Sequence, residues 1–494
     1  MEDNEKNVKS KVLAGSFWLF MEKGGLGIIE FAVAWVLARF FLDPSDYATV
    51  GLIAIFIGFS NVFVKSGFNY SIIQKKDLNE DDKNTVFWVS TVIGVFFYII
   101  LFFAAPFVAK FYAKPILKPV MRVEAVVLIF DALSIVHSSL LEKELAFRKI
   151  CIKSIVTAVF SAAIGLTLAI MGAGLWTIVA QTVSTSVIGC IMLMILSKWM
   201  PKFSFSRKSF RESFGFSSRM LTSGVINNVY CNALPIAMEK VYEENSLGYY
   251  TKAKTIPTKV SELANSAVTS IVFPSLSNYQ DDKKRIKEMT RRFIVTSCFL
   301  TFALMAGLIA VAKPLILFLY SEKWAGSIVF MEFICVSNAL TPINSANLQA
   351  IKALGQSRIY LKLEIIKNGI GIILLALTMI FTRKLPGAIY YVLAAQTIIS
   401  FICVVINAWP NRKLMDYSVV EQIKDVVPSF LLATVMCIAA YSVTFLGLPN
   451  WLTLIIQVPV GAVIYVGGAV LFKFECFTYL WNTAKTYING RLKK

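Results

Sequence analysis

Residues 106–125 read PFVAKFYAKPILKPVMRVEA, and residues 314–333 read PLILFLYSEKWAGSIVFMEF. Without gaps, three residue types coincide 208 positions apart: Pro106 with Pro314, Tyr112 with Tyr320, and Glu124 with Glu332. The neighbouring positions are mostly apolar in both stretches. Because long membrane proteins often contain repeated halves, this alignment predicts an internal duplication of the chain.

The composition places the chain in a lipid bilayer. Hydrophobic residues make up 57% of the 494 residues and charged residues only 16%, against about 45–50% and about 25% in soluble domains. A bilayer core takes about 20 apolar residues per helix. About fourteen such runs are predicted, at 12–38, 47–65, 85–109, 119–139, 150–171, 174–196, 214–239, 255–277, 293–320, 327–351, 360–382, 386–409, 425–446 and 450–472.

The repeat and the runs together predict an all-α integral membrane fold. The offset of the repeat spans six runs, and an even number of helices gives both halves the same topology, so their pseudo-two-fold axis runs along the membrane normal. Two six-helix lobes facing each other leave a central cavity that can open to either side. The predicted parts are an N-terminal lobe at 1–196, a basic cytoplasmic linker at 197–213, a C-terminal lobe at 214–409, and two appended helices with a basic cytoplasmic tail at 410–494.

The basic residues predict the orientation. Lysine and arginine concentrate in alternate loops, for example in residues 198–211 and 283–292, and such loops stay on the cytoplasmic side. Both termini are therefore predicted to be cytoplasmic. The first residues, MEDNEKNVKSKV, mix acids with lysines, so no cleavable signal peptide is expected. The net charge of +19 is spread between apolar runs, which argues against a nucleic-acid partner.

No catalytic or metal chemistry is predicted. The eight cysteines lack metal or redox spacing, and His137 is the only histidine. The cysteines are interpreted as small buried hydrophobic residues. We expect neither a metal site nor a cofactor, and coupling to a proton or sodium gradient stays open.

Ionisable residues inside apolar runs are costly and usually mark a cavity or pathway. The first, seventh and eighth runs hold the candidates. Substrate contacts are predicted at Lys23, Arg219, Lys259, Asn228 and Asn232, and charge-pairing or proton-coupling groups at Glu22, Glu30 and Glu262. Lysine and arginine suit a phosphate or diphosphate, and the asparagines suit sugar hydroxyls. The alternative is that these paired charges only satisfy each other.

Five stretches resemble bacterial polysaccharide transporters, the Wzx-like flippases of the multidrug/oligosaccharidyl-lipid/polysaccharide exporter superfamily. They are SIIQKKDLNEDDKNTVFW (71–88), LLEKELAFRK (140–149), FPSLSNYQDD (273–282), MAGLIAVAKPLILFLYSEKW (305–324) and ALGQSRIYLKLEIIK (353–367). Their order and spacing over residues 10–470 carry the resemblance.

The resemblance implies a two-lobed exporter in a bacterial inner membrane. It implies that an undecaprenyl-diphosphate-linked oligosaccharide crosses from the inner to the outer leaflet, beside a polymerase or export machine. One departure concerns the seventh run, where many relatives carry an acid and an amide. Here residues 231–242 read CNALPIAMEKVY, with Leu234 and Pro235 at those places, which puts cation coupling through that acid in doubt.

Two rival functions are kept. A drug or organic-cation exporter of the same architecture would need an acidic, aromatic cavity, whereas the runs here hold more basic groups. A membrane-embedded glycan-modifying transferase, the enzyme alternative, would need a sizeable polar loop with clustered acids or a histidine base. The longest loops, 197–213 and 278–292, are short and basic, so a transporter rather than an enzyme is predicted.

Overall fold

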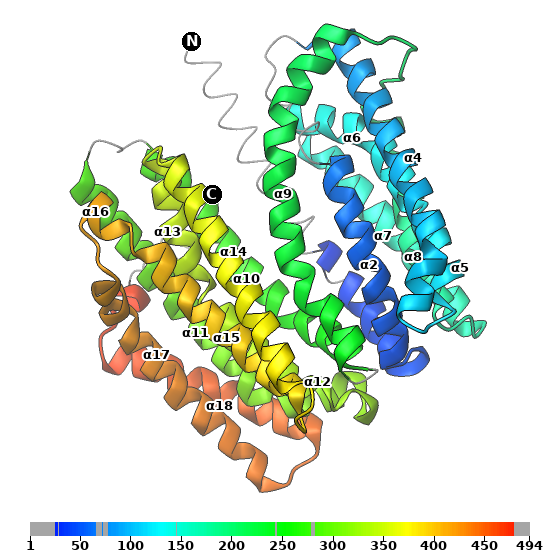
Figure 1. The fold of residues 1–494 in the computed structure, drawn as a ribbon. Helices are drawn as coiled ribbons and strands as arrows, with labels where there is room; N and C mark the ends of the chain where they lie inside the picture. The colour runs from blue at the N-terminus through cyan, green and yellow to red at the C-terminus, as the bar shows by residue number, and fades with distance from the viewer. Residues whose placement is uncertain are drawn as a thin grey trace, which may run out of the picture. The chain divides into compact units, whose positions relative to one another are not determined.

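All regular elements that the structure describes are helices (Figure 1). The computed structural model describes residues 25–27, 29–65, 72, 78–144, 146–242, 245–277 and 282–478. The chain forms two compact units, Met1–Gly248 and Tyr249–Lys494. The predicted linker at residues 197–213 separates the two halves of the sequence repeat, whereas the two units are separated by how the helices pack. The two divisions describe different properties, and the predicted linker stays a prediction.

The helices of the first unit follow a short π-helical segment, Leu37–Phe41. They are α2 (Pro44–Lys65), α4 (Glu80–Phe111), α5 (Leu117–Glu124), α6 (Val127–Lys143), α7 (Phe147–Ile170), α8 (Trp176–Ser197) and α9 (Arg207–Val241). Helix α9 packs along α2 within this unit.

The second unit contains most of α10 and all later elements. They are α10 (Ser246–Ser277), α11 (Lys283–Tyr320), η2 (Glu322–Trp324), α12 (Ser327–Ala339), α13 (Thr341–Ala353), α14 (Ser357–Thr382), α15 (Ala388–Ala408), α16 (Asn411–Met415), α17 (Val419–Ser442), η3 (Val443–Leu446) and α18 (Asn450–Leu471).

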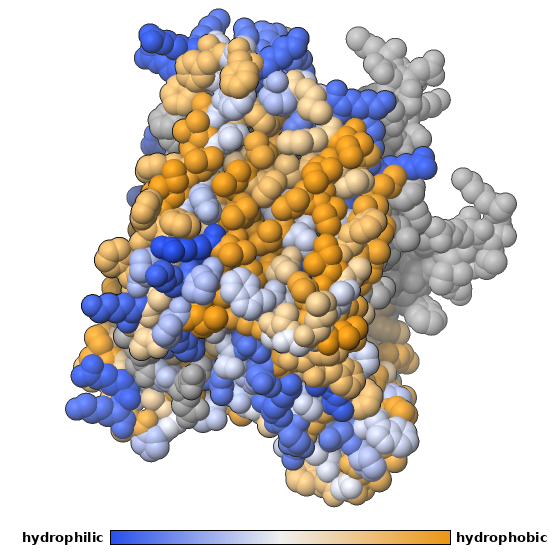
Figure 2. Space-filling model, turned by 90° about the vertical axis from the view of Figure 1, so that its right-hand side faces the viewer, coloured by the Kyte–Doolittle hydropathy of each residue, from blue (hydrophilic) through white to orange (hydrophobic). Residues whose placement is uncertain are grey.

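Ten helical segments of the described residues are long and apolar enough to cross a bilayer. Large apolar side chains such as Phe103 and Phe107 of α4 stay exposed, and Figure 2 shows one face with a broad apolar band between hydrophilic ends. Such a band matches hydrocarbon rather than water. The all-helical membrane fold is therefore confirmed. Helices α9 and α10 occupy two further predicted runs, and the count of fourteen stays a prediction.

Two runs predicted as single helices are each divided in two. The run 119–139 contains the end of α5 and most of α6, and the run 327–351 contains α12 and α13. Pro342 explains the second break, because it lies in the first turn of α13. There proline needs no backbone hydrogen bond, whereas inside a continuous helix it would remove one.

The stretch NEDDKNTVFW (79–88) starts α4 and holds the connection to α9. A capping box joins Asn79 and Asp82 at the helix start, which satisfies free backbone donors there. One turn further on, the Asn84 side chain accepts from the Lys202 backbone N–H at 2.8 Å, and the Trp88 indole donates to the Lys202 carbonyl at 3.0 Å. This stretch, which is part of the resemblance to the transporter family, thus hydrogen-bonds residues of the predicted linker to the start of α4.

The helices appended after the second half pack onto α11 of the second unit. Helices α17 and α18 form an antiparallel pair joined by a tight turn at Gly447, whose φ of 65° suits glycine (Figure 1). The Tyr465 hydroxyl of α18 donates to the Phe299 carbonyl of α11 at 2.6 Å. The ion pair Arg291–Asp425, at 2.6 Å, joins α11 to α17.

A buried amide cluster also holds α17 in place. Asn347 of α13 and Gln422 of α17 exchange two hydrogen bonds of 2.8 and 3.0 Å. Asn411 of α16 donates to the Asn347 side-chain oxygen at 2.6 Å. All three side chains are fully buried, so each amide depends on the others to replace water.

We predict that Asn347→Leu lowers the unfolding temperature of the purified protein in detergent, measured by intrinsic fluorescence. The substitution leaves the Gln422 and Asn411 amides buried without their partner, at about 1–3 kcal/mol for each unsatisfied group. The control is Thr434→Val on the exposed face of α17, where the hydroxyl bonds only to its own helix. Equal unfolding temperatures for the two variants would contradict this role.

Candidate functional site

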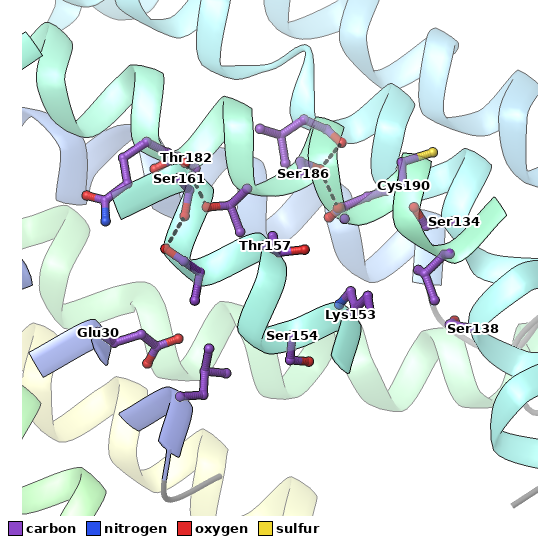
Figure 3. A pocket seen from close by; sticks show the side chains of 18 of the residues that line it. Glu30, Ser134, Ser138, Lys153, Ser154, Thr157, Ser161, Thr182, Ser186 and Cys190 are labelled. Atoms are coloured by element: carbon purple, nitrogen blue, oxygen red, sulfur yellow. Dashed lines mark hydrogen bonds between the residues drawn. The ribbon is translucent and has the colours of Figure 1, made fainter. Parts of the chain in front are cut away.

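A polar cavity of about 570 Å³ lies within the first unit. Helices α6, α7 and α8 form most of its wall, and α2 and the helical residues before Leu37 complete it. Small hydroxyl side chains dominate the polar lining. They are Ser134 and Ser138 of α6, Ser154, Thr157 and Ser161 of α7, and Thr182, Thr185 and Ser186 of α8 (Figure 3).

Helical periodicity explains how the hydroxyls gather. Ser154, Thr157 and Ser161 are separated by three and four residues, so they project from one face of α7 (Figure 3). Thr182, Thr185 and Ser186 repeat the pattern on α8, which packs against α7 after the short turn at 171–175. Gly189, one further turn along α8, adds no side chain to the space.

Most of these hydroxyls already donate a hydrogen bond within the protein. Thr182 donates to the Ile178 carbonyl at 2.9 Å and Thr185 to the Gln181 carbonyl at 2.7 Å. Ser161 donates to the Ala158 carbonyl at 3.2 Å. Because a hydroxyl has one donor and two acceptor lone pairs, these groups can still accept hydrogen bonds from a molecule in the cavity.

Four charged side chains face the cavity, two acids and two lysines: Glu30, Lys65, Asp131 and Lys153. Lys65 Nζ lies 2.7 Å from Asp131 Oδ2, with 56% of the lysine side chain exposed and 18% of the aspartate. Ser186 donates to the other Asp131 oxygen at 2.8 Å. The ion pair and the serine thus join α2, α6 and α8, and the charges of the described lining residues balance.

The structure places the predicted site residues of the first unit in different surroundings. Glu30 lines the cavity with an exposed side chain. Asn228 and Asn232 lie one turn apart in α9, where the Asn232 amide donates to the Asn228 side-chain oxygen at 3.0 Å. Glu22, Lys23 and the side chain of Arg219 lie outside the described part of the chain.

Lys259 and Glu262 belong to the second unit. Both are exposed on α10, three residues apart. Whether they share a cavity with Glu30 and the α9 asparagines stays a prediction, as does coupling through Glu22, Glu30 or Glu262.

Sequence reasoning missed most of the cavity in the first unit. It concentrated on charges in three runs, whereas the polar part of the lining consists mainly of serine and threonine from three other helices. The missed signal is the hydroxyl spacing along 154–161 and 182–186. Lys153, in the second turn of α7, was not among the predicted site residues.

Comparison with known families agrees with this architecture. A family model described as "Polysaccharide biosynthesis protein" matches residues 36–329, more than half of the chain. The chain therefore belongs to this family of polysaccharide biosynthesis proteins, and the resemblance to Wzx-like transporters is confirmed.

Two curated relatives resemble most of the chain. The teichuronic acid biosynthesis protein TuaB of Bacillus subtilis is 22% identical over 466 residues, which cover 93% of this chain and 95% of the relative. The lipopolysaccharide biosynthesis protein WzxC of Escherichia coli is 19% identical over 371 residues, 73% of this chain and 74% of the relative.

Solved structures show the same fold. The lipid II flippase MurJ in an inward closed conformation superposes with a TM-score of 0.75 at 18% identity, covering 93% of this chain and 98% of that chain. An inward-facing multidrug resistance transporter of the MATE family gives 0.60 at 14% identity, covering 80% and 96%. The fold is therefore shared by flippases and drug exporters.

The strength of the Lys65–Asp131 ion pair shows whether water fills the cavity. We predict a coupling free energy of about 0.2–1 kcal/mol between the two side chains, because solvent screens such a pair. A double-mutant cycle of Lys65→Met and Asp131→Asn, followed by reversible denaturation in detergent, measures it. The exposed Glu80–Lys83 pair on α4 is the reference cycle, and a coupling several times larger at Lys65–Asp131 would show a dry cavity.

Proposed function

We propose that this protein is a membrane transporter that moves a lipid-linked oligosaccharide from the inner to the outer leaflet of a bacterial inner membrane. Family membership supports the connection to polysaccharide synthesis. Its relatives, which include the succinoglycan biosynthesis transport protein ExoT of Rhizobium meliloti, connect such chains with cell-envelope glycans and transport. The fold that it shares with the lipid II flippase MurJ supports the flipping reaction.

The polar lining of the cavity is the physical observation that supports this transport function. A sugar head group cannot cross hydrocarbon unaided, because each polar group without a partner costs several kcal/mol there, roughly. Eight serine and threonine side chains and four charged residues line the cavity beside apolar spans. Such a lining replaces the water around a hydroxyl-rich head group, while the lipid tail stays in the bilayer.

The finer features of the mechanism form part of the proposal. They are about fourteen helices, two six-helix lobes around an axis along the membrane normal, alternating access, and cytoplasmic termini. An undecaprenyl diphosphate carrier, a polymerase or export partner, and coupling to a proton or sodium gradient complete it. The duplication of the Pro-Tyr-Glu pattern and the distribution of basic residues support this arrangement.

The drug-exporter alternative fits the cavity less well. A cavity for organic cations needs a surplus of acids and aromatic faces. The described residues that line this cavity include no aromatic side chain, and their two acids are balanced by two lysines. A transferase has less support, because the similar proteins include a succinoglycan biosynthesis transport protein and a lipid II flippase.

Reconstitution tests the proposed function directly. Purified protein in proteoliposomes is expected to speed the appearance of a fluorescent lipid-linked oligosaccharide in the opposite leaflet, measured by quenching from outside. Protein-free liposomes provide the baseline. A rate equal to that baseline, with transport of a fluorescent organic cation instead, would favour the drug exporter.

We predict that Lys259→Gln or Arg219→Gln lowers glycan export in cells by about tenfold or more, since each removes one charge-assisted hydrogen bond to the head group. The amount of protein in the membrane should not change. Lys254→Gln, another exposed lysine of α10, is the matched control. Normal export in both variants would remove these two residues from the site.

A further inference from the structure

Thr157 differs from the other hydroxyls of the cavity. Its side chain lines the cavity and is only 4% exposed, yet its hydroxyl has no hydrogen-bond partner in the described part of the chain. The nearby hydroxyls of Ser161 and Thr182 donate to carbonyls of their own helices. A buried hydroxyl without a partner lowers stability, and this one lies at the wall of a cavity, so the two observations together point to a ligand.

The fold leaves room beside this hydroxyl. Gly189 of α8 faces Lys153 and Thr157 of α7, and a Cβ atom added there would lie 3.6 Å from Lys153 Cε and 3.8 Å from Thr157 Cγ2. Any side chain larger than alanine would extend into the space between the two helices. Glycine therefore keeps open the part of the cavity that lies in front of Thr157.

The electrostatics of the cavity favour a neutral group. Among the lining residues that the structure describes, two lysines and two acids balance, and Lys65 is engaged with Asp131. A diphosphate needs a surplus of cationic donors, which these described residues do not supply. Sugar hydroxyls need hydrogen-bond acceptors. The hydroxyls of α7 and α8 that already donate to a backbone carbonyl can supply them through their lone pairs.

We infer that this cavity binds the uncharged sugar part of the lipid-linked glycan, and that Thr157 is a specificity-determining residue that hydrogen-bonds one sugar hydroxyl. The inference rests on the proposed function and deepens it. Sugar hydroxyls donate to the free lone pairs of the lining hydroxyls, while Thr157 can both donate and accept. The diphosphate is then held outside this cavity.

Lipid binding to the full-length protein tests the inference. The probes are undecaprenyl diphosphate and the same lipid carrying one glucose or one galactose, and native mass spectrometry in mild detergent measures their relative affinities. The wild-type protein is expected to prefer a sugar-bearing lipid. Thr157→Val should reduce this preference by about three- to tenfold, the value of one hydrogen bond, with unchanged affinity for the bare lipid. Ser161→Ala should reduce it in the same direction.

Two controls separate binding from folding. Thr157→Ser keeps the hydroxyl and should keep the preference. Thr167→Val changes an exposed threonine of the same helix, outside the cavity, that bonds to its own backbone, and should have no effect. Thr157→Val should not lower the unfolding temperature without lipid, because valine has the same shape and removes an unpartnered polar group.

The outcomes distinguish this inference from the proposed function. If the wild-type protein binds none of the three lipids, the proposed function fails. If it binds bare and sugar-bearing lipids equally, or if Thr157→Val keeps the full preference, the inference is overturned and the proposed function stands. A lower unfolding temperature for Thr157→Val would assign the hydroxyl a structural role and would also overturn the inference.

Discussion

The structure depends on the cost of an unpaired polar group away from water. In hydrocarbon, a helix satisfies the hydrogen-bonding groups of its own backbone. Many serine and threonine hydroxyls here are satisfied in the same way, by donating to backbone carbonyls of their own helix, as Thr182 and Ser184 do. Asn347 and Gln422 satisfy each other in the second unit. Against this pattern, the buried and unpartnered hydroxyl of Thr157 is informative because it lies at the wall of a cavity.

The same requirement explains the polar stretch at 79–88. Asn79 and Asp82 cap α4. Asn84 and Trp88 bind the backbone of Lys202, and Thr85 binds the backbone of Ser206. A connection between helices has backbone groups that no regular element satisfies. The motif supplies those partners and fixes the path of the chain into α9. The stretch at 79–88, which resembles a transporter family, therefore has a structural role in positioning the connection before α9.

The fold was predictable from sequence because a membrane-spanning helix can be recognised from a long run of apolar residues. Runs such as 85–109 and 450–472 fall within α4 and α18, and proline explains the break before α13. The cavity was not predictable in the same way. Isolated charges such as Glu30 stand out in an apolar run, whereas Ser154, Thr157 and Ser161 do not, because one such hydroxyl can be satisfied by its own helix. Only packing shows which of them face a common space.

The two predicted halves share a proline at matching places but differ in the chemistry of one helix face. Pro106 and Pro314 lie inside the corresponding helices α4 and α11. When Arg148 is aligned with Arg358, Ser154 and Thr157 of α7 fall on Glu364 and Lys367 of α14, which form an ion pair with each other. In the second half this helix face is satisfied internally, whereas in the first half it turns hydroxyls toward a cavity. A paired charge needs no ligand, and the unpartnered Thr157 hydroxyl lies at a cavity wall, so the proposed recognition of the sugar falls in the first half.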